Sequence, residues 1–406
     1  MIKTKVNSTL LKNVNRKGIM KVIDSSNVIS RVGLKKRLGK NGKTVTNIIN
    51  SLINDSLIMP VGYSPFTGGR RRELLSINPN FGYLIGIHLD IRFLRGVITD
   101  FKYNIIAEEK IAIVSNEPTK SIIQKIKRTL DFLVKNERIN TDKILGIGFA
   151  ANGYYNEKKG EWILSVNNKN WKNVPIREIL SKYYDVPIYL ENNSRAMALW
   201  EKSFGKAKNQ KDVVYLNLST GISSVIIKDG RIYRGVGNNS GEFGHTIVEI
   251  NGDLCSCGKR GCLETVASGW ALTKKARKSI ESGVKSEIQD LIDGDINNIE
   301  IDIIFSAFHR GDKYATELLE SASNYLGVAI ANIINLINPE LVILGGHFAT
   351  LGDMFLTRVA EKVKDFAQPL LFDDVEILAS AIDDRAAVLG VTTLIRDKYF
   401  HIDAIK

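Results

Sequence analysis

The pattern of hydrophobic and polar positions changes once along the chain. In residues 9–58, apolar residues recur every three to four positions, which is the spacing of one buried face of a helix. From Tyr83 onward, short apolar runs typical of strands alternate with longer helical segments. The sequence therefore predicts a helical N-terminal module, residues 1–80, followed by an α/β body.

The N-terminal module is predicted to be a winged helix-turn-helix. Helices are expected over residues 9–25, after Ser30, which is suited to cap a helix start, and from Lys43 onward. Two short strands, 57–59 and 73–78, flank the sequence TGGRRR and would form the wing. In this arrangement the last helix enters the major groove of DNA, although any three-helix domain can give the same helical pattern.

The net charge of the chain is +12, and all of it lies in the N-terminal module. Residues 1–80 contain nine Lys and six Arg against three acidic residues, and the remaining residues are balanced. A basic module on a neutral body is typical of proteins that contact phosphates, whereas a solvated basic tail would lack the apolar pattern. We therefore expect operator DNA as a partner. The candidate DNA contacts are exposed residues of the third helix and the wing: Lys43, Thr44, Thr46, Asn47, Arg70, Arg71 and Arg72.

The body is predicted to form two α/β lobes. Strand-like runs are YLIGIHL, ILGIGFA and PIYLEN in the first half, and VVYLNLSTG, SSVIIKDG and LVILGG in the second. Each half begins with a hairpin-like pair of strands, and two such lobes can hold a small ligand in a cleft between them. The lobes are expected to span residues 81–196 and 197–383, with residues 384–406 returning to the first lobe.

The cellular compartment is inferred from two features that the sequence does not show, a secretory signal and a membrane-spanning segment. The first ten residues contain lysines but no apolar run of the kind found in secretory signals. No window approaches the 18 or so uncharged apolar residues of a membrane-spanning helix. We therefore expect a cytoplasmic protein whose cysteines are reduced.

All three cysteines lie in one segment of eight residues, CSCGKRGC. Under reducing conditions, clustered thiols are more often metal ligands or redox groups than disulfides. Cys255, Cys257 and Cys262, together with His245, supply the four ligands of a structural Zn²⁺ site and leave no coordination position for water. The alternative is a loop with buried or incidental thiols. We expect one structural zinc ion per chain.

Five segments of the body occur in the order found in one protein family. ENNSRA, STGISS, SGEFGH, CSCGKRGCLE and VILGG resemble the sugar and nucleotide segments of the ROK family, which unites sugar-responsive repressors with sugar kinases. The N-terminal module resembles that of the family's repressors, and NKNWKNV is similar to a segment of xylose repressors. The resemblance covers nearly the whole chain. It implies an actin-like, hexokinase-like pair of lobes and self-association as a homodimer or homotetramer.

The resemblance also implies a sugar site. It assigns the contacts to side chains that can bracket sugar hydroxyls with hydrogen bonds: Asn167, Asn192, Asn193, Glu242, His245 and Glu264. Asn167 and Asn192 could instead cap loops, and Glu242 and Glu264 could hydrogen-bond a metal ligand. His245 is claimed by both sites, and we assign it to the metal with a sugar contact beside it.

Kinase activity is not expected, because three features of the family's kinases are altered. Their first phosphate loop, Asp-x-Gly-Gly-Thr, is matched by a segment from His88 to Arg92 that has no glycine and carries Asp90. The second loop, residues 219–224, keeps one glycine. The catalytic aspartate is matched by Asn193, and an amide cannot act as a general base.

The sequence therefore predicts a repressor that binds operator DNA and is released by a sugar, a pentose and specifically D-xylose. Two other hypotheses are an active ROK-type sugar kinase and a repressor that is controlled by a protein partner instead of a sugar.

Overall fold

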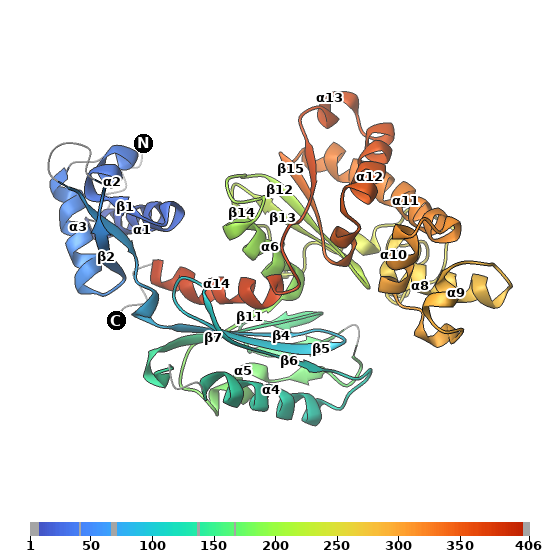
Figure 1. Ribbon diagram of the computed structural model, residues 1–406, viewed down its shortest axis with the longest axis horizontal. Coiled ribbons are helices and arrows are strands. Elements are labelled where there is room, and N and C mark those ends of the chain that lie inside the picture. The colour runs from blue at the N-terminus through green and yellow to red at the C-terminus, as the bar shows by residue number, and fades with distance from the viewer. Residues whose placement is uncertain (1–7, 40–41, 66–70, 136–138, 166–167, 401–406) are drawn as a thin grey trace. The chain divides into compact units, whose positions relative to one another are not determined.

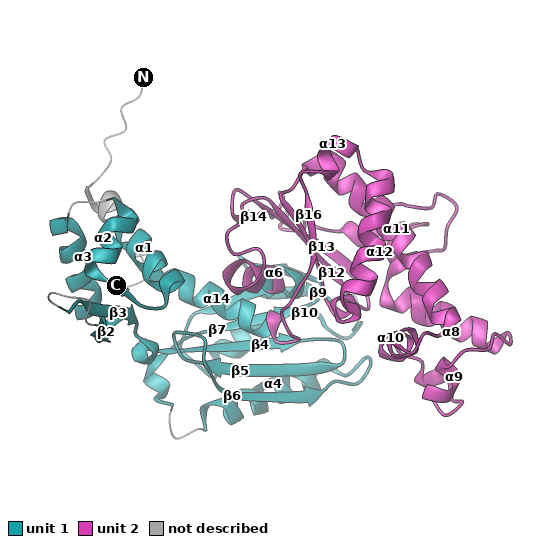
Figure 2. Cartoon of the chain, turned by 45° about the horizontal axis from the view of Figure 1, so that its top comes forward, with its two compact units in different colours: residues 1–196, 387–406 teal, residues 197–386 magenta. Residues whose placement is uncertain are grey.

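The chain leaves one compact unit and returns to it near its end. The computed structural model describes residues 8–39, 42–65, 71–135, 139–165 and 168–400. The first unit comprises residues 1–196 and 387–406, and the second comprises residues 197–386 (Figure 2). The chain therefore passes between the units twice.

The N-terminal module has the predicted winged helix-turn-helix architecture (Figure 1). The Ser30 hydroxyl accepts a hydrogen bond from the Gly33 amide at 3.1 Å and caps the second helix, and Gly39, with a φ of 58°, ends it in the left-handed region. Both local predictions are confirmed. The helices are α1 (Ser8–Ser26), α2 (Arg31–Leu38) and α3 (Gly42–Asn54), and β1 (Ile29–Ser30), β2 (Ile58–Tyr63) and β3 (Glu73–Ile77) form a sheet in the order β1-β3-β2.

The rest of the first unit is built on a five-stranded mixed sheet. Its strands, in the order β11-β7-β4-β5-β6, are β4 (Tyr83–Leu89), β5 (Phe93–Thr99), β6 (Ile105–Ala112), β7 (Ile144–Ala151) and β11 (Ile188–Asn192). β4, β5 and β6 pair antiparallel, whereas β7 and β11 run parallel to β4. The carboxyl ends of β4, β7 and β11 therefore meet at one edge, where ligands bind in open α/β sheets.

Helices cover both faces of this sheet (Figure 1). Successive strand residues point to opposite faces. Ile85 and Ile87 pack in the cluster that includes α4 (Thr119–Val134), whereas Gly86 lies against α14 (Ala386–Phe400). A small sheet that the sequence analysis did not predict contributes Trp162 to the α4 side. This sheet contains β8 (Tyr154–Asn156), β9 (Glu161–Leu164) and β10 (Lys172–Val174), and α5 (Ile176–Ser181) follows it.

The sheet of the second unit has the same strand order as the first. Its strands, in the order β14-β13-β12-β15-β16, are β12 (Val213–Leu218), β13 (Ile222–Lys228), β14 (Arg231–Ile232), β15 (Leu341–Gly345) and β16 (Glu376–Ala379). The first three strands pair antiparallel, and the last two add in parallel. Two lobes with one connectivity confirm the predicted α/β body.

Helices also cover both faces of the second sheet. Val213 and Tyr215 pack in a cluster with Ala198 of α6 (Asn193–Phe204), whereas Val214 and Leu216 pack in the larger cluster on the other face. The helices of that larger cluster are α8 (Gly269–Glu281), α10 (Ile301–His309), α11 (Lys313–Ile337) and α12 (Gly352–Phe366), and α7 (Glu264–Ala267), α9 (Ile288–Leu291) and α13 (Pro369–Phe372) are short. Of the helices described, none combines the length and apolarity needed to cross a membrane.

We expect Gly86→Ala to lower the free energy of unfolding by roughly 1–3 kcal/mol or more, because the added methyl group would collide with the Val388 main-chain carbonyl of α14. Urea unfolding followed by circular dichroism measures the change. Gly18→Ala is the control, since a Cβ at this helical position meets only Leu38 Cδ2 at 3.9 Å and should leave stability unchanged or raise it by up to about 1 kcal/mol. Equal effects of the two substitutions would contradict the packing of α14 on β4.

Candidate functional site

Four potential metal ligands converge in the second unit. One ligand atom from each of His245, Cys255, Cys257 and Cys262 lies within 4.8 Å of the others. The distance from Cys255 Sγ to His245 Nδ1 is 3.6 Å, and Cys257 Sγ and Cys262 Sγ are also 3.6 Å apart. A tetrahedron with metal–sulfur bonds of about 2.3 Å has edges of about 3.8 Å, so these side chains fit one metal ion. The predicted ligand set is thus brought together, and it could bind a metal ion.

Backbone turns fix the shape of residues 245–262, the segment that carries the four ligands and is called the metal loop below. The Gly258 amide donates to the Cys255 carbonyl at 2.9 Å, and the Cys255 amide donates to the Lys259 carbonyl at 2.7 Å. Gly261 has a φ of 73° and packs against the Glu249 main chain, where a side chain would not fit. The sequence between the thiols therefore permits a tight loop that brings the three sulfur atoms close together.

The surroundings of the cluster suit a bound cation. Burial, and after it the neighbouring Cys257 and Cys255, together raise the pKa of the Cys262 thiol to about 12, so a nearby positive charge is what would favour the thiolate. His245 directs Nδ1 at Cys255 and places Nε2 3.9 Å from a carboxylate oxygen of Glu242. A carboxylate on the far side of a metal-binding imidazole fixes the orientation of the ring. At 3.9 Å the two atoms are too far apart for a hydrogen bond, so the alternative role of Glu242 stays a prediction.

Glu264 joins the metal loop to the turn between β12 and β13. It begins α7, two residues after Cys262, and its Oε2 accepts a hydrogen bond from the Ile222 amide at 3.0 Å. The Gly269 amide donates to the Ser219 carbonyl at 2.8 Å and ties the same turn to α8. A carboxylate on an amide of this turn opposes the binding of a phosphate there, since both are anions. This turn is the segment that resembles the second phosphate loop of the kinases.

In the first unit, the two predicted asparagines lie where β11 meets α6. The Asn192 side chain accepts a hydrogen bond from the Ser194 amide at 2.9 Å and donates one to the Gly153 carbonyl at 3.3 Å, so it caps α6. This is the capping role that the sequence analysis left open beside sugar binding. Asn193 is the first residue of α6 and is buried. The preceding residue, Glu191, is fully buried and accepts from Tyr155 Oη and Arg195 Nε at 3.0 and 2.6 Å.

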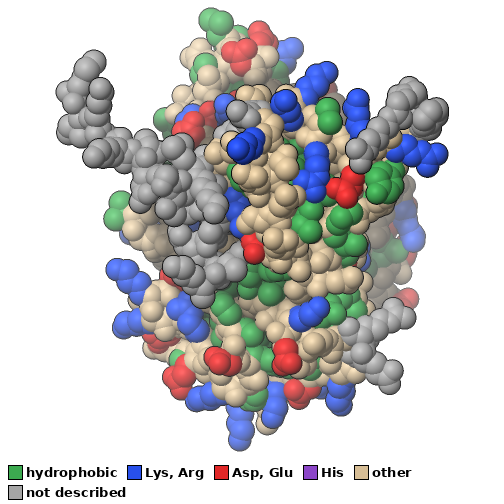
Figure 3. All heavy atoms as spheres, turned by 90° about the vertical axis from the view of Figure 1, so that its left-hand side faces the viewer, with side chains coloured by type: hydrophobic (Ala, Val, Ile, Leu, Met, Phe, Trp, Pro, Cys, Tyr) green, Lys and Arg blue, Asp and Glu red, His purple; other side chains and the backbone are tan. Residues whose placement is uncertain are grey.

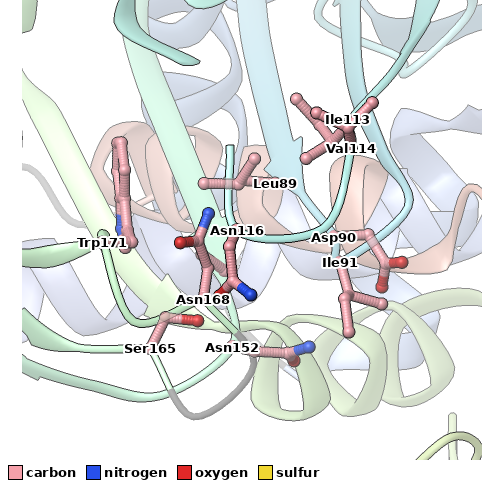
Figure 4. A pocket seen from close by; sticks show the side chains of 11 residues that line it. Leu89, Asp90, Ile91, Ile113, Val114, Asn116, Asn152, Ser165, Asn168 and Trp171 are labelled. Carbon is pink, nitrogen blue, oxygen red and sulfur yellow. The ribbon is translucent and has the colours of Figure 1, made fainter. Parts of the chain in front are cut away.

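A pocket opens at the carboxyl ends of β4 and β7 (Figure 4), and Ala151 in its lining pairs with Asn192 of β11. Its apolar part includes Leu89, Ile113 and Trp171, and its polar part includes Asn152 and Ser165. In Figure 4, Asn152 and Ser165 lie at the lower end of the pocket and Ile113 at the upper end. The sequence analysis missed Asn152 and Ser165, although Asn152 directly follows a buried strand, which is a recognisable signal in an α/β sheet.

The segment that replaces the first phosphate loop is a tight hairpin turn at the same pocket. The Asp90 amide donates to the Phe93 carbonyl at 2.8 Å, and the Asp90 carboxylate accepts from the Arg92 amide at 3.2 Å. Asp90 and Ile91 both line the pocket. A negative side chain therefore stands where the kinases carry glycines.

The surface of the N-terminal module is polar on the side that was predicted to meet DNA. Helix α3 buries Val45, Ile48, Ile49 and Leu52, and it exposes Lys43, Thr44, Thr46 and Asn47. Arg71 and Arg72 are exposed before β3. Figure 3 views the molecule from the left-hand side of Figure 1 and shows Lys and Arg side chains at many places on the face turned to the viewer.

The predicted sugar contacts are distributed over both units. Asn192 and Asn193 belong to the first unit, whereas Glu242, His245 and Glu264 belong to the second, where they adjoin the metal loop. Two further predicted residues, Asn167 for sugar and Arg70 for DNA, lie outside the described residues.

Comparison with known proteins identifies the family. The sequence profile of the ROK family matches residues 84–398. The xylose repressor of Caldicellulosiruptor bescii is 31% identical over 96% of this chain and 97% of its own length, and the glucokinase of Thermotoga maritima is 32% identical over 62% of this chain and 79% of its own. Among solved structures, a ROK family transcriptional regulator, homologue of the E. coli MLC protein, aligns with a TM-score of 0.80 at 24% identity over 96% of this chain and 97% of that chain. The chain belongs to the ROK family.

Proposed function

We propose that this protein is a sugar-responsive transcriptional repressor that binds operator DNA through its N-terminal module and is released by D-xylose. The observation that carries the proposal is the union, in one chain, of a basic helix-turn-helix with a ROK body. The resemblance of ENNSRA to the family's kinases adds the expectation that Asn193 stands at the position of their catalytic aspartate. The match to a xylose repressor spans both parts, whereas the match to a glucokinase covers 62% of the chain.

The N-terminal module would place α3 in the major groove. Thr46 and Asn47 are exposed one turn from the start of the helix and carry side chains that can donate to and accept from base edges. The exposed Arg71 and Arg72 of the wing are suited to phosphates, which position the protein without reading sequence. Since helix-turn-helix proteins commonly bind paired half-sites, we propose a homodimer or homotetramer as the DNA-binding species, acting in the cytoplasm.

The body would bind the sugar without phosphorylating it. Asn193 can donate and accept a hydrogen bond but cannot take a proton from a hydroxyl group. The carboxylates at Asp90 and Glu264 disfavour the phosphates of a nucleotide at both segments that match phosphate loops. We propose Asn167, Asn192, Asn193, Glu242 and Glu264, with His245 beside them, as the sugar contacts.

Zinc is the ion that we propose for the metal loop. Three thiolates and one imidazole are the ligands that Zn²⁺ prefers in closed, structural sites. The four residues would hold the ion, and the ion would supply a rigid cross-link for the segment that carries Glu264.

Gel-shift assays on an operator duplex, selected by the protein from a random-sequence library, test the function as a whole. We expect xylose to release the duplex and ATP to add nothing. Release by glucose but not xylose would overturn the effector, and a requirement for ATP would favour the kinase alternative. Release that needs a cell extract and no sugar would favour control by a protein partner.

The metal proposal predicts about one zinc ion per chain by plasma mass spectrometry of protein purified without chelator. Cys257→Ser should reduce the metal content and lower the thermal midpoint by several degrees, because the Cys257 side chain is exposed and the substitution removes a ligand without removing packing. Ser256→Ala, at the adjacent position, should change neither measurement. Full zinc occupancy in Cys257→Ser would contradict the ligand assignment.

The DNA proposal predicts two kinds of variant in fluorescence-anisotropy titrations. Asn47→Ala should relax the preference at one base position by about 1–3 kcal/mol, and Thr46→Ala should act in the same way. Arg71→Ala should weaken binding to all sequences and reduce the slope of affinity against salt concentration by about one. Lys364→Ala removes an exposed charge from α12 and should leave the slope unchanged. A normal salt slope in Arg71→Ala would argue against a wing contact.

The sugar proposal predicts that Glu264→Gln loses at least about tenfold in xylose affinity, because a carboxylate accepts stronger hydrogen bonds than a neutral amide. The amide oxygen can still accept from the Ile222 amide, so the turn should persist and the variant should bind the operator. Isothermal titration with xylose and gel shifts without sugar measure the two properties. Glu361→Gln on the exposed face of α12 is the control. Unchanged xylose affinity in Glu264→Gln would remove this residue from the site.

A further inference from the structure

Helix α14 contacts both the sheet of the first unit and the start of α6. Gly86 and Gly148 allow the main chain of α14 to touch two strands. Gly390 lies against the carbonyl of Ala196, where a methyl group would collide with the main chain. The chain continues into the second unit after Ala196 and returns from it at the start of α14. The two segments that connect the units therefore touch each other at this point.

The other end of α14 is buried against the N-terminal module. Ile395 and Phe400 belong to one apolar cluster with Ile19 and Ile23 of α1. Helix α14 has 15 residues and forms a stiff rod about 22 Å long. One rigid element thus runs from the connection between the units to the module that carries α3.

Arg396 adds a charged, directional contact at that far end. Its side chain is 3% exposed, and both terminal nitrogens reach the carboxylate of Asp24 in α1, at 2.5 and 3.3 Å. The guanidinium also lies over the rings of Phe101, Tyr103 and Phe400, at 4.6–5.2 Å from their centroids. A two-pronged pair constrains relative orientation, whereas an apolar contact can slide.

We propose that α14 couples the effector to DNA, with the Arg396–Asp24 pair as its contact to the N-terminal module. This inference rests on the proposed function. In this scheme a bound sugar shifts the start of α14, where the chain returns from the second unit, and the Arg396–Asp24 pair carries the shift to α1. Arg396 and Asp24 are positioning residues in this scheme, since neither is among the proposed sugar or DNA contacts.

The test compares Asp24→Asn with Asp55→Asn. Asp55 pairs with Arg16 inside the N-terminal module, and the two pairs have nearly equal side-chain exposure, 3% and 35% for Arg396 and Asp24 against 9% and 37% for Arg16 and Asp55. Operator affinity is measured with and without xylose, and the ratio of the two affinities gives the coupling. We expect the ratio to fall at least fivefold in Asp24→Asn, with unchanged xylose affinity in the absence of DNA. Asp55→Asn should keep the wild-type ratio, and Asp24→Glu should restore most of it.

The inference would be overturned if Asp24→Asn kept the wild-type ratio of operator affinities without and with xylose. It would also be overturned if Asp55→Asn lowered this ratio as much as Asp24→Asn does. If Asp24→Asn does not fold, Arg396→Lys carries the same comparison, because it keeps the charge and loses the two-pronged contact.

A second measurement separates this inference from the identity of the effector. Coupling is reciprocal, so operator DNA should slow amide hydrogen exchange in residues 391–400 of the wild-type protein and less so in Asp24→Asn. If xylose has no effect on the wild type, the proposed effector is wrong and this exchange experiment decides the coupling. Equal protection in both proteins would overturn it. If no duplex binds at all, the DNA proposal and this inference fall together.

Discussion

Main-chain contact between α14 and the first sheet governs how the first unit is assembled. Three glycines, at positions 86, 148 and 390, allow the helix to approach two strands and α6 more closely than side chains would permit. Since protein interiors are close-packed, that approach determines how closely the helix packs on the sheet. Ile395 and Arg396 then present an apolar side chain and a charge to α1 at fixed places, and the N-terminal module docks on them.

The metal loop plays a comparable part in the second unit. Four ligand atoms converge in this loop. Glu264, which follows the last cysteine by two residues, accepts a hydrogen bond from the Ile222 amide. Phosphate-binding loops depend on free amide groups and on the absence of negative charge. A carboxylate bound to such an amide reverses both conditions, so it disfavours a nucleotide phosphate at this turn. Asp90 has the same effect in the turn between β4 and β5.

Local patterns in the sequence were sufficient for the N-terminal module and the metal loop. Ser30 and Gly39 form their capping hydrogen bonds with residues at most four positions away. The three cysteines lie so close in sequence that one short loop brings their sulfur atoms together. Helix α14 was harder to predict than α3, because it is buried on more than one side and has no single apolar stripe. Its pair with Asp24 joins residues 372 positions apart, which no local signal can reveal.

The role of Asn192 could not be assigned from the sequence, for a physical reason. Asn192 has the donor and acceptor groups that a sugar needs, and in the structure it uses them to cap α6 and to bind the Gly153 carbonyl. The same chemistry serves both purposes, so sequence alone leaves both open. The small sheet of β8, β9 and β10 was missed because strands of three or four residues are too short for an alternating pattern to stand out.

The return of α14 to the first unit also determines the order in which the chain can fold. During synthesis, β4 to β11 and the helices of the N-terminal module are made first, but the glycine-lined face of the sheet and the apolar side of α1 stay uncovered until the second unit has been made. Domains generally fold as they emerge, N-terminal part first. In this protein, the first sheet and the N-terminal module cannot complete their packing until α14 has been synthesised. A nascent or prematurely ended chain therefore exposes apolar surface for a chaperone or protease to recognise, because the N-terminal module packs on α14.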